Sequence, residues 1–302
     1  MSRLADALAR AGGVPTARPV AVPQLPSAPA PRPVAAPEAP VRLVRAPQPG
    51  DATPGSLRTN HHFEGKLVGT RGMPHACVEQ YRKLAASLHH LQVERKMRTL
   101  MISSGMPGEG KTLTVCNIAL TLSESYGRRV LLIDADLRRP SLHQLFDLPN
   151  VTGLGDGLRR EHDHPLPLVQ VSPRLTVLTG GRPDPDPMSS LTSARMQRVI
   201  SEGTALFDWV LIDTPPVGLL SDGRLLTNMV EGVLLVIRAG LTPFALVTRA
   251  IEAVGRDRIV GVVLNAVPAA DLQASGYGSY GYGYYGAPAG AEGADGAARG
   301  QE

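Results

Sequence analysis

The sequence predicts an α/β protein with a doubly wound, mostly parallel β-sheet. Six strand-length apolar runs alternate with segments of helical periodicity between residues 98 and 267, which is typical of repeated βαβ units. The first run leads into the glycine-rich stretch GMPGEGKT at residues 105–112, and a helical segment follows at once. Strand, glycine-rich loop and helix in this order are the context of a phosphate-binding loop. We therefore expect the P-loop NTPase fold.

Composition sets the limits of this prediction. The 302 residues are 43% hydrophobic and 19% charged, which fits one sizeable domain with extensions or two small domains. The net charge of +4 favours phosphate-bearing or acidic partners, and we expect no nucleic-acid partner. Apolar runs such as GVLLVI at 232–237 are far shorter than the roughly 20 residues of a membrane helix. We expect a cytoplasmic protein without membrane insertion, in which Cys77 and Cys116 are buried, reduced thiols.

The N-terminal region differs in composition from the rest. Residues 1–11 have the spacing of a short amphipathic helix, which is either a frayed terminus or a docking helix that folds on a partner. Residues 12–57 are rich in proline and alanine, and this composition predicts a disordered, semi-stiff linker. The P-loop domain is expected over residues 75–270, followed by a flexible, Gly/Tyr-rich tail over residues 271–302.

Within the domain, the spacing of apolar residues assigns each element. A helix is predicted over 78–95. Strands are predicted at 98–104, 128–136, 174–181, 208–216, 231–240 and 258–267. Further helical segments are predicted at 141–146, 189–206, 221–230 and 243–254. Because the strands are apolar throughout, both faces of the sheet are expected to be covered by helices.

GMPGEGKT fits the pattern G-x-x-x-x-G-K-[ST] of a nucleotide-binding loop. Its glycines let successive backbone amides point at phosphate oxygens, and the following helix adds its positive N-terminal dipole. Lys111 is expected to neutralise the β- and γ-phosphates, and Thr112 to offer its hydroxyl to Mg²⁺. The predicted ATP-binding residues are Gly105, Met106, Pro107, Gly108, Glu109, Gly110, Lys111, Thr112 and Leu113.

Three aspartates end predicted strands. Asp134 and Asp136 close the strand of LLIDAD, and Asp213 closes that of VLID. Ligands bind at the carboxyl edge of open α/β sheets, and an aspartate in the position of Asp213 holds Mg²⁺ in P-loop proteins. A single aspartate here is also compatible with a helix cap. We predict Thr112, Asp136 and Asp213 as metal ligands, and Lys111, Asp134, Asp136 and Asp213 as the catalytic residues.

Five of the seven tyrosines lie in the stretch SGYGSYGYGYYGAPAG at 275–290. Glycine and serine separate them, and such a composition cannot order itself by burial. The stretch is either a low-complexity tail that only associates with other surfaces, or a segment whose phenol hydroxyls have a chemical role of their own. The tyrosines are Tyr277, Tyr280, Tyr282, Tyr284 and Tyr285.

The trio GMPGEGKT, LLIDADLRRP and VLIDTPP resembles the Walker A, A′ and B motifs of bacterial tyrosine kinases, the cytoplasmic autokinases of capsule and exopolysaccharide synthesis. PDPDPMSSLTSARM, VGLLSDGRLL, GVVLN and the tyrosine-rich tail extend the resemblance over about residues 78–290. It implies a kinase with ATP and Mg²⁺ as cofactors that phosphorylates its own tail tyrosines, with transfer in trans. Of Asp134 and Asp136, one would accept the phenol proton and the other support the metal; we favour Asp134 as the base.

The resemblance also implies partners. A separate membrane-bound polysaccharide chain-length protein would activate the kinase and recruit it to the inner face of the cell membrane. A homo-oligomer is expected through the family's E-x-x-R-x-x-R motif, of which Glu79 and Arg82 are present and Ala85 replaces the second arginine. The family's ring interface is therefore incomplete in this sequence.

Other interpretations remain open at this stage. Partition and positioning ATPases share the P-loop class but have a lysine directly after the first glycine, where this chain has Met106. A nucleotide-binding scaffold whose tail only associates is the third possibility. His162 and His164 either bind a metal or are solvated. The basic residues between 82 and 98 form a solvated helix face, or face an acidic partner or a neighbouring tail.

Overall fold

The structure is a computed structural model that describes residues 43–45, 59–159, 165–218, 226–268 and 271. The N-terminal segment 1–11, the tail tyrosines and both His162 and His164 lie outside these described residues. Within the described part of the chain, no helix is long and apolar enough to cross a membrane.

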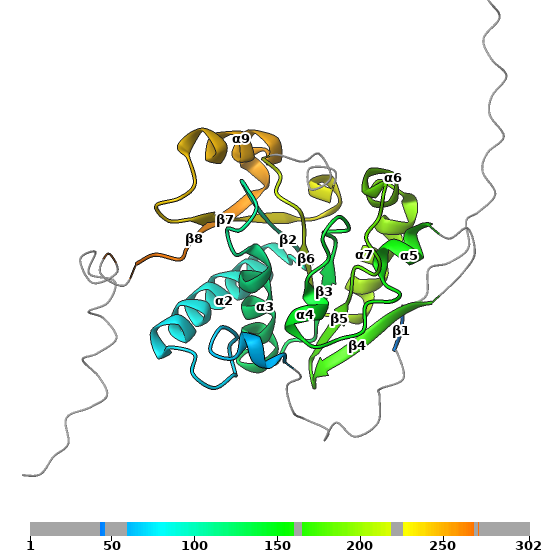
Figure 1. Cartoon of the computed structure of the whole chain (residues 1–302), viewed down its shortest axis with the longest axis horizontal. Helices are drawn as coiled ribbons and strands as arrows, with labels where there is room; N and C mark the ends of the chain where they lie inside the picture. The colour runs from blue at the N-terminus through cyan, green and yellow to red at the C-terminus, as the bar shows by residue number, and fades with distance from the viewer. Residues whose placement is uncertain (1–42, 46–58, 160–164, 219–225, 269–270, 272–302) are drawn as a thin grey trace, which may run out of the picture. The chain divides into compact units, whose positions relative to one another are not determined.

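An eight-stranded sheet forms the centre of the domain (Figure 1), in the order β1-β4-β5-β3-β6-β2-β7-β8. Every neighbouring pair is parallel except β4 and β5, which are antiparallel. The predicted mostly parallel, doubly wound sheet is therefore confirmed. The strands are β1 (Leu43–Arg45), β2 (Thr99–Ser104), β3 (Val130–Asp134), β4 (Leu166–Ser172), β5 (Leu175–Leu178), β6 (Trp209–Asp213), β7 (Gly232–Arg238) and β8 (Ile259–Asn265).

Helices cover both faces of the sheet (Figure 1), because alternate residues of the central strands face opposite sides. In β3, Leu132 belongs to the core cluster that includes side chains of α2, α3 and α4, whereas Leu131 and Ile133 belong to the cluster that includes side chains of α5, α6, α7 and α9. The helices are α2 (His75–Arg95), α3 (Lys111–Glu124), α4 (Leu142–Leu145), α5 (Leu154–Arg159), α6 (Pro187–Leu191), α7 (Ala194–Leu206) and α9 (Phe244–Val254). Short 3-10 turns are η1 (His61–Phe63), η2 (Thr227–Met229) and η3 (Arg256–Arg258).

Two strands lie outside the six predicted ones. The sequence of β4, LPLVQVS, contains a proline that weakens a strand prediction. β1 falls inside the predicted linker over 12–57 and pairs with β4 in parallel. Three residues are too few for a recognisable hydrophobic pattern, so pairing with β4 is what makes β1 a strand.

Two further features differ from the sequence-based expectations. Residues between 59 and 74 pack against the domain, and Leu67 and Val68 are buried in the core around α3. The expectation of two buried thiols is wrong for Cys77, which is exposed in the first turn of α2. Cys116 on α3 is buried as expected, and both thiols are free.

Candidate active site

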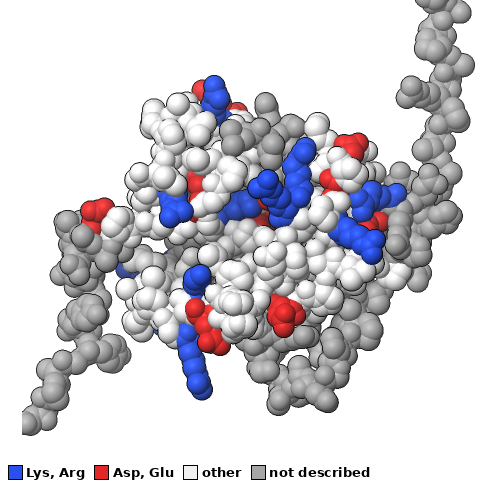
Figure 2. Space-filling model, in the orientation of Figure 1, with Lys and Arg blue, Asp and Glu red and all other residues white. Residues whose placement is uncertain are grey.

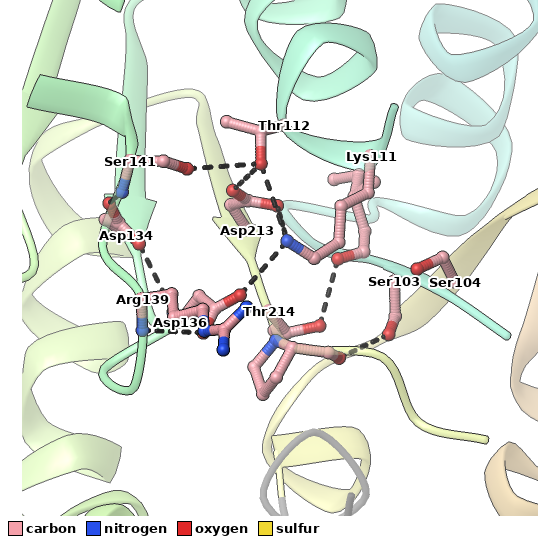
Figure 3. A network of polar contacts seen from close by, with 12 residues as sticks. Ser103, Ser104, Lys111, Thr112, Asp134, Asp136, Arg139, Ser141, Asp213 and Thr214 are labelled. Carbon is pink, nitrogen blue, oxygen red and sulfur yellow. Dashed lines mark hydrogen bonds and ion pairs between the residues drawn. The ribbon is translucent and has the colours of Figure 1, made fainter. Parts of the chain in front are cut away.

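Three parallel strands bring the predicted site residues together at one edge of the sheet. β2 leads into the glycine-rich loop, and α3 begins at Lys111. The ends of β3 and β6 lie side by side, with Asp134 and Asp213 in register, and β6 also pairs with β2. Figure 3 shows these side chains converging around the first turn of α3.

The backbone of the loop requires glycine at two positions. Gly108 and Gly110 have φ angles of 81° and 88°, in the left-handed region that side chains disfavour. A Cβ atom on Gly110 would also lie 2.1 Å from Nδ2 of Asn265, which itself donates to the Glu109 carbonyl at 2.8 Å. No side chain caps α3, so its first amides are available to an anion.

Lys111 extends from α3 towards the acidic strand ends. Its Nζ lies 3.1 Å from Oδ2 of Asp136 and 3.9 Å from Oδ1 of Asp213, and its side chain is largely buried. Burial alone would lower the pKa of Lys111, but the carboxylates of Asp213 and Asp136 outweigh it and raise that pKa. Lys111 is therefore a fixed cation, able to pair with a phosphate that displaces its carboxylate partners.

Asp213 and Thr112 form the part of the site that fits a divalent cation. Thr112 Oγ1 donates to Oδ2 of Asp213 at 2.7 Å, while Oδ1 of Asp213 is buried without a hydrogen-bond partner among the described residues. Burial raises the pKa of Asp213, and Lys111 and Thr112 offset this only in part. A buried carboxylate oxygen that accepts no hydrogen bond from the described residues, beside a hydroxyl, suits Mg²⁺, which prefers oxygen ligands.

The described residues contain no group of three or more His, Cys, Asp or Glu side chains arranged to hold a metal by themselves. This finding is compatible with Mg²⁺, which is usually held by one or two carboxylates together with water and substrate phosphates. Asp213 and Thr112 would supply the protein ligands in such a site.

Asp134 is occupied by the backbone that follows β3. Its Oδ2 accepts the amides of Ser141 (2.8 Å) and Leu142 (3.0 Å), and its Oδ1 accepts the amide of Asp136 (3.2 Å). The side chain is fully buried, and burial together with the charge of Asp213 raises the pKa of Asp134 to about 7. This geometry is that of a residue that shapes the loop from β3 to α4.

Asp136 lies closer to the open side of the site than Asp134. It retains 8% exposure, its Oδ2 accepts from Lys111, and its Oδ1 accepts the amide of Arg139 at 3.2 Å. Figure 3 shows the Arg139 side chain lying beside it. Asp136 therefore combines contact with the P-loop lysine and partial access from solvent.

Several residues that the sequence analysis did not single out complete the site. Ser141 Oγ lies 3.5 Å from Thr112 Oγ1, and Asn265 and Thr242 hold the loop from the side of β7 and β8. Glu109, which was predicted to bind ATP, turns its buried carboxylate to the Met106 amide and the Thr242 hydroxyl. Only its backbone can therefore face a nucleotide. No motif spacing reveals Thr242 or Asn265, because both are far from Glu109 in the sequence and only the folded structure brings them to the loop.

Glu79 and Arg82, the predicted interface residues, lie on α2 away from this cluster. They form an exposed ion pair at 2.6 Å. Ala85 is fully buried in the core, so an arginine at this position of α2 would point into the domain.

The surface drawn in Figure 2 has basic side chains gathered across its middle and to the right, with acidic side chains among them. Such a surface favours phosphate-bearing ligands.

A glycine-rich loop, a lysine, a threonine and strand-end aspartates at the carboxyl edge of a parallel sheet define a P-loop nucleotide-binding protein. Comparison with known families agrees, since residues 100–279 match the CobQ/CobB/MinD/ParA nucleotide binding domain family.

The similar proteins narrow this class. The chain is 37% identical over 208 residues to the tyrosine-protein kinase YwqD of Bacillus subtilis, spanning 68% of this chain and 85% of that protein. It is 31% identical over 191 residues to the tyrosine-protein kinase CpsD of Streptococcus agalactiae, spanning 62% and 83%. The kinase domain of the Escherichia coli tyrosine kinase Etk superposes with a TM-score of 0.59 at 32% identity, covering 63% of this chain and 75% of that one.

The chain therefore belongs to the bacterial tyrosine-protein kinases. It is a protein-tyrosine kinase with a nucleotide-binding domain.

Proposed function

We propose that this kinase transfers the γ-phosphate of ATP to the tyrosines of its own C-terminal tail, in trans, and thereby regulates capsular or exopolysaccharide synthesis or export. The observation that carries the proposal is the place where the tail begins. β8 ends at Asn265, whose side chain donates to the P-loop carbonyl of Glu109. The chain beyond β8 thus starts at the edge of the sheet that holds the catalytic cluster.

The length of the tail supports transfer between subunits. A flexible segment of ten to eighteen residues has an r.m.s. reach of about 16 to 25 Å. This reach allows a tail tyrosine to enter the site of an adjacent molecule. The acceptors would be Tyr277, Tyr280, Tyr282, Tyr284 and Tyr285.

The roles of the site residues follow from their contacts. The backbone of 105–113 would cradle the phosphates, and Lys111 would pair with the β- and γ-phosphates. Thr112 and Asp213 would hold Mg²⁺. When bound, Mg²⁺ neutralises charge on the phosphates. The phenol oxygen forms a bond to the γ-phosphorus as the bond to the β–γ bridging oxygen breaks, and ADP leaves.

The phenol proton needs an acceptor, and the structure favours Asp136 over Asp134. Asp134 has no exposed surface, and both of its oxygens already accept backbone amides. Asp136 is partly exposed and would lose its ion pair with Lys111 once Lys111 turns to phosphate. A general base must first be within reach of the proton, and only then does its pKa matter. Asp136 thus takes the proton, and Asp134 positions the loop on which Asp136 lies.

Assembly and recruitment belong to the same proposal. The exposed Glu79–Arg82 pair on α2 would contribute to a homo-oligomer, although Ala85 removes the second arginine of the family motif. A separate membrane-bound chain-length protein would hold the kinase at the inner face of the cell membrane. The resemblance to capsule and exopolysaccharide kinases supports this partner.

A complementation experiment with two full-length variants, neither of which can phosphorylate itself, tests transfer in trans. Lys111→Met keeps the tail but lacks the phosphate-binding lysine; a variant with all five tail tyrosines changed to phenylalanine keeps the site but lacks acceptors. With labelled ATP and Mg²⁺, neither variant alone should become phosphorylated, while their mixture should label the Lys111→Met chain. Strong phosphotyrosine on the five-fold phenylalanine variant would refute the tail as acceptor. Labelling of wild-type protein that does not depend on its concentration, with no labelling in the mixture, would refute transfer in trans.

A further inference from the structure

A second basic site lies at the opposite edge of the sheet from the P-loop. A cavity of about 390 Å³ is lined by Gln92, Val93, Lys96, Arg98, Arg128 and Asp208, here called the basal pocket. Lys96 and Arg98 lie between α2 and β2, Arg128 lies two residues before β3, and Asp208 directly precedes β6. The pocket is therefore at the amino ends of the three strands whose carboxyl ends form the catalytic cluster.

The cations of the basal pocket have few partners within the described residues. The Lys96 ammonium makes no hydrogen bond or ion pair there. Among the described residues, the Arg98 guanidinium donates only through Nη2, to the Phe207 carbonyl at 3.3 Å. Arg128 contacts Nδ1 of His89 at 3.3 Å through Nη2, and its Nε is buried without a hydrogen-bond partner. The pocket thus presents hydrogen-bond donors and positive charge that the described part of the protein leaves uncompensated.

The only carboxylate lining the basal pocket is already neutralised. Asp208 accepts the Arg129 amide at 2.8 Å and its guanidinium at 3.1 Å. Burial would raise the pKa of Asp208, but the hydrogen bonds and charge of Arg129 outweigh it and hold that pKa below its usual value. The nearby Glu231 is engaged by the backbone amides of Arg98 and Thr99. The charge of Arg128 also lowers the pKa of Asp208, but among the described residues neither carboxylate forms an ion pair with Lys96 or Arg128.

The shape and chemistry of the basal pocket suit an aromatic phosphate. Arginine and lysine together recognise phosphate oxygens by charge-assisted hydrogen bonds. Val93, an exposed apolar side chain on the same wall, offers a surface for a ring. The cavity volume is ample for one phenyl phosphate group.

We propose that the basal pocket binds phosphotyrosine of this protein's own tail after autophosphorylation, and this inference rests on the proposed function. Strands β2, β3 and β6 have five or six residues each, so the pocket and the catalytic cluster are about 16 to 20 Å apart. A tail held in the pocket is away from the catalytic cluster of the same molecule. Binding there withdraws a finished tail and leaves the catalytic edge free for an unmodified one.

A synthetic tail peptide tests the basal pocket independently of kinase activity. The peptide covers residues 275–287 and carries chemically installed phosphotyrosine at Tyr284 and Tyr285. The receptor is the full-length Lys111→Met chain, whose own tail stays unmodified, and fluorescence polarisation gives the affinity. We expect the phosphopeptide to bind at least about tenfold more tightly than the unmodified peptide, since charged hydrogen bonds are the stronger ones. Phenyl phosphate should compete.

Variants of the pocket separate ligand binding from folding. Lys96 has a φ angle of 54°, a left-handed conformation that glycine adopts without strain. Lys96→Gly should therefore leave Tm unchanged or higher and yet weaken phosphopeptide binding about tenfold; Arg128→Gln should weaken it similarly. Lys83→Ala, which removes an exposed charge from α2, should change the affinity for the phosphopeptide less than about twofold.

Two results would overturn the inference. One is equal binding of the phosphorylated and unmodified peptides, including the absence of binding by both. The other is undiminished phosphopeptide binding by the Lys96→Gly/Arg128→Gln double variant. Because the phosphate is installed chemically, these results do not depend on whether the kinase modifies its own tail.

Discussion

Asp134 and Asp136 are two residues apart, yet their surroundings give them different tasks. β3 ends at Asp134, whose side chain accepts the backbone amides that follow the strand, whereas Asp136 lies beyond the strand and faces the P-loop lysine. Asp134 binds three backbone amides, whereas Asp136 binds the lysine that receives the phosphate. Under the proposed function, the paired carboxylates of the motif would thus divide into a loop-shaping residue, Asp134, and a proton acceptor, Asp136.

Asparagine substitutions separate these tasks. Asp136→Asn should keep the fold and lower tyrosine phosphorylation by about 100-fold or more, the usual contribution of a general base. Asp134→Asn should instead cost about 1–3 kcal/mol of stability, because the one oxygen of asparagine cannot serve both sides: its NH₂ must face the N–H of Asp136 or those of Ser141 and Leu142. Thermal unfolding and labelled-ATP assays on both variants give the comparison. A stable Asp134→Asn protein without activity, beside an active Asp136→Asn protein, would reverse our assignment.

The same cluster makes stability and Mg²⁺ binding depend on pH. The folded-state pKa of Asp134 is raised to about 7 and that of Asp213 is also raised, both mainly by burial. A carboxyl whose pKa is higher in the folded state binds more protons there, so stability of the nucleotide-free protein should fall as pH rises from about 4 through 7. Urea unfolding across this pH range measures the slope.

Mg²⁺ favours the charged carboxylates, so its binding near neutral pH should release protons. Calorimetric titrations in two buffers of different ionisation enthalpy report the number released. Asp213→Asn should weaken Mg²⁺ binding and reduce the release. Binding heats that are the same in both buffers would contradict the raised pKa values.

Among the elements, the P-loop is anchored from behind by the connection between β7 and α9. The carboxylate of Glu109 accepts the Met106 amide at 2.8 Å, the Arg238 amide at 3.3 Å and the Thr242 hydroxyl. The Arg238 guanidinium donates to the Gly108 carbonyl at 3.3 Å. These contacts hold the loop in its curled form before any nucleotide arrives, which lowers the ordering cost of binding.

Removing the Glu109 carboxylate should therefore weaken ATP binding more than it slows phosphate transfer. Glu109→Ala should raise KM for ATP about tenfold and change kcat by less than about threefold, since charged hydrogen bonds contribute 1.5–3 kcal/mol. Thr242→Val, which loses one hydroxyl contact, should show a smaller change in the same direction. Steady-state kinetics with an exogenous tyrosine peptide measures both constants. A fall in kcat at constant KM would mean that Glu109 acts on the transition state.

For strands, helices and loops, the sequence predicts those elements that a local pattern of residues determines. Six apolar runs become strands, and GMPGEGKT becomes the loop before α3 because its glycines match the required backbone. β1 is too short to carry a periodic pattern, and only β4 makes it a strand. The anchoring role of Glu109 depends on Thr242, 133 residues away, and no spacing rule connects the two. The different burial of Asp134 and Asp136 likewise depends on the turn that begins α4.

On the scale of the whole molecule, the proposed phosphorylation would change the charge of the tail and, with it, the repulsion between chains that assemble. The unmodified chain has a net charge of +4, and each phosphotyrosine adds about −1.5 to −2, so full modification of the five tail tyrosines reverses the sign to about −4 to −6. The added charge is concentrated in one segment. Under the proposed function, phosphorylated tails would therefore repel each other and the acidic groups of neighbouring subunits.

Phosphorylation should accordingly loosen an oligomer that unmodified chains form. Analytical ultracentrifugation of chain incubated with MgATP, beside the same chain treated with phosphatase, should show a smaller average mass for the phosphorylated sample. The difference should shrink at high salt, because screening weakens repulsion between exposed charges. The five-fold phenylalanine variant should have one mass with or without MgATP. Equal masses for both wild-type samples at low salt would show that assembly does not respond to tail charge, and the tail would then act on a partner instead.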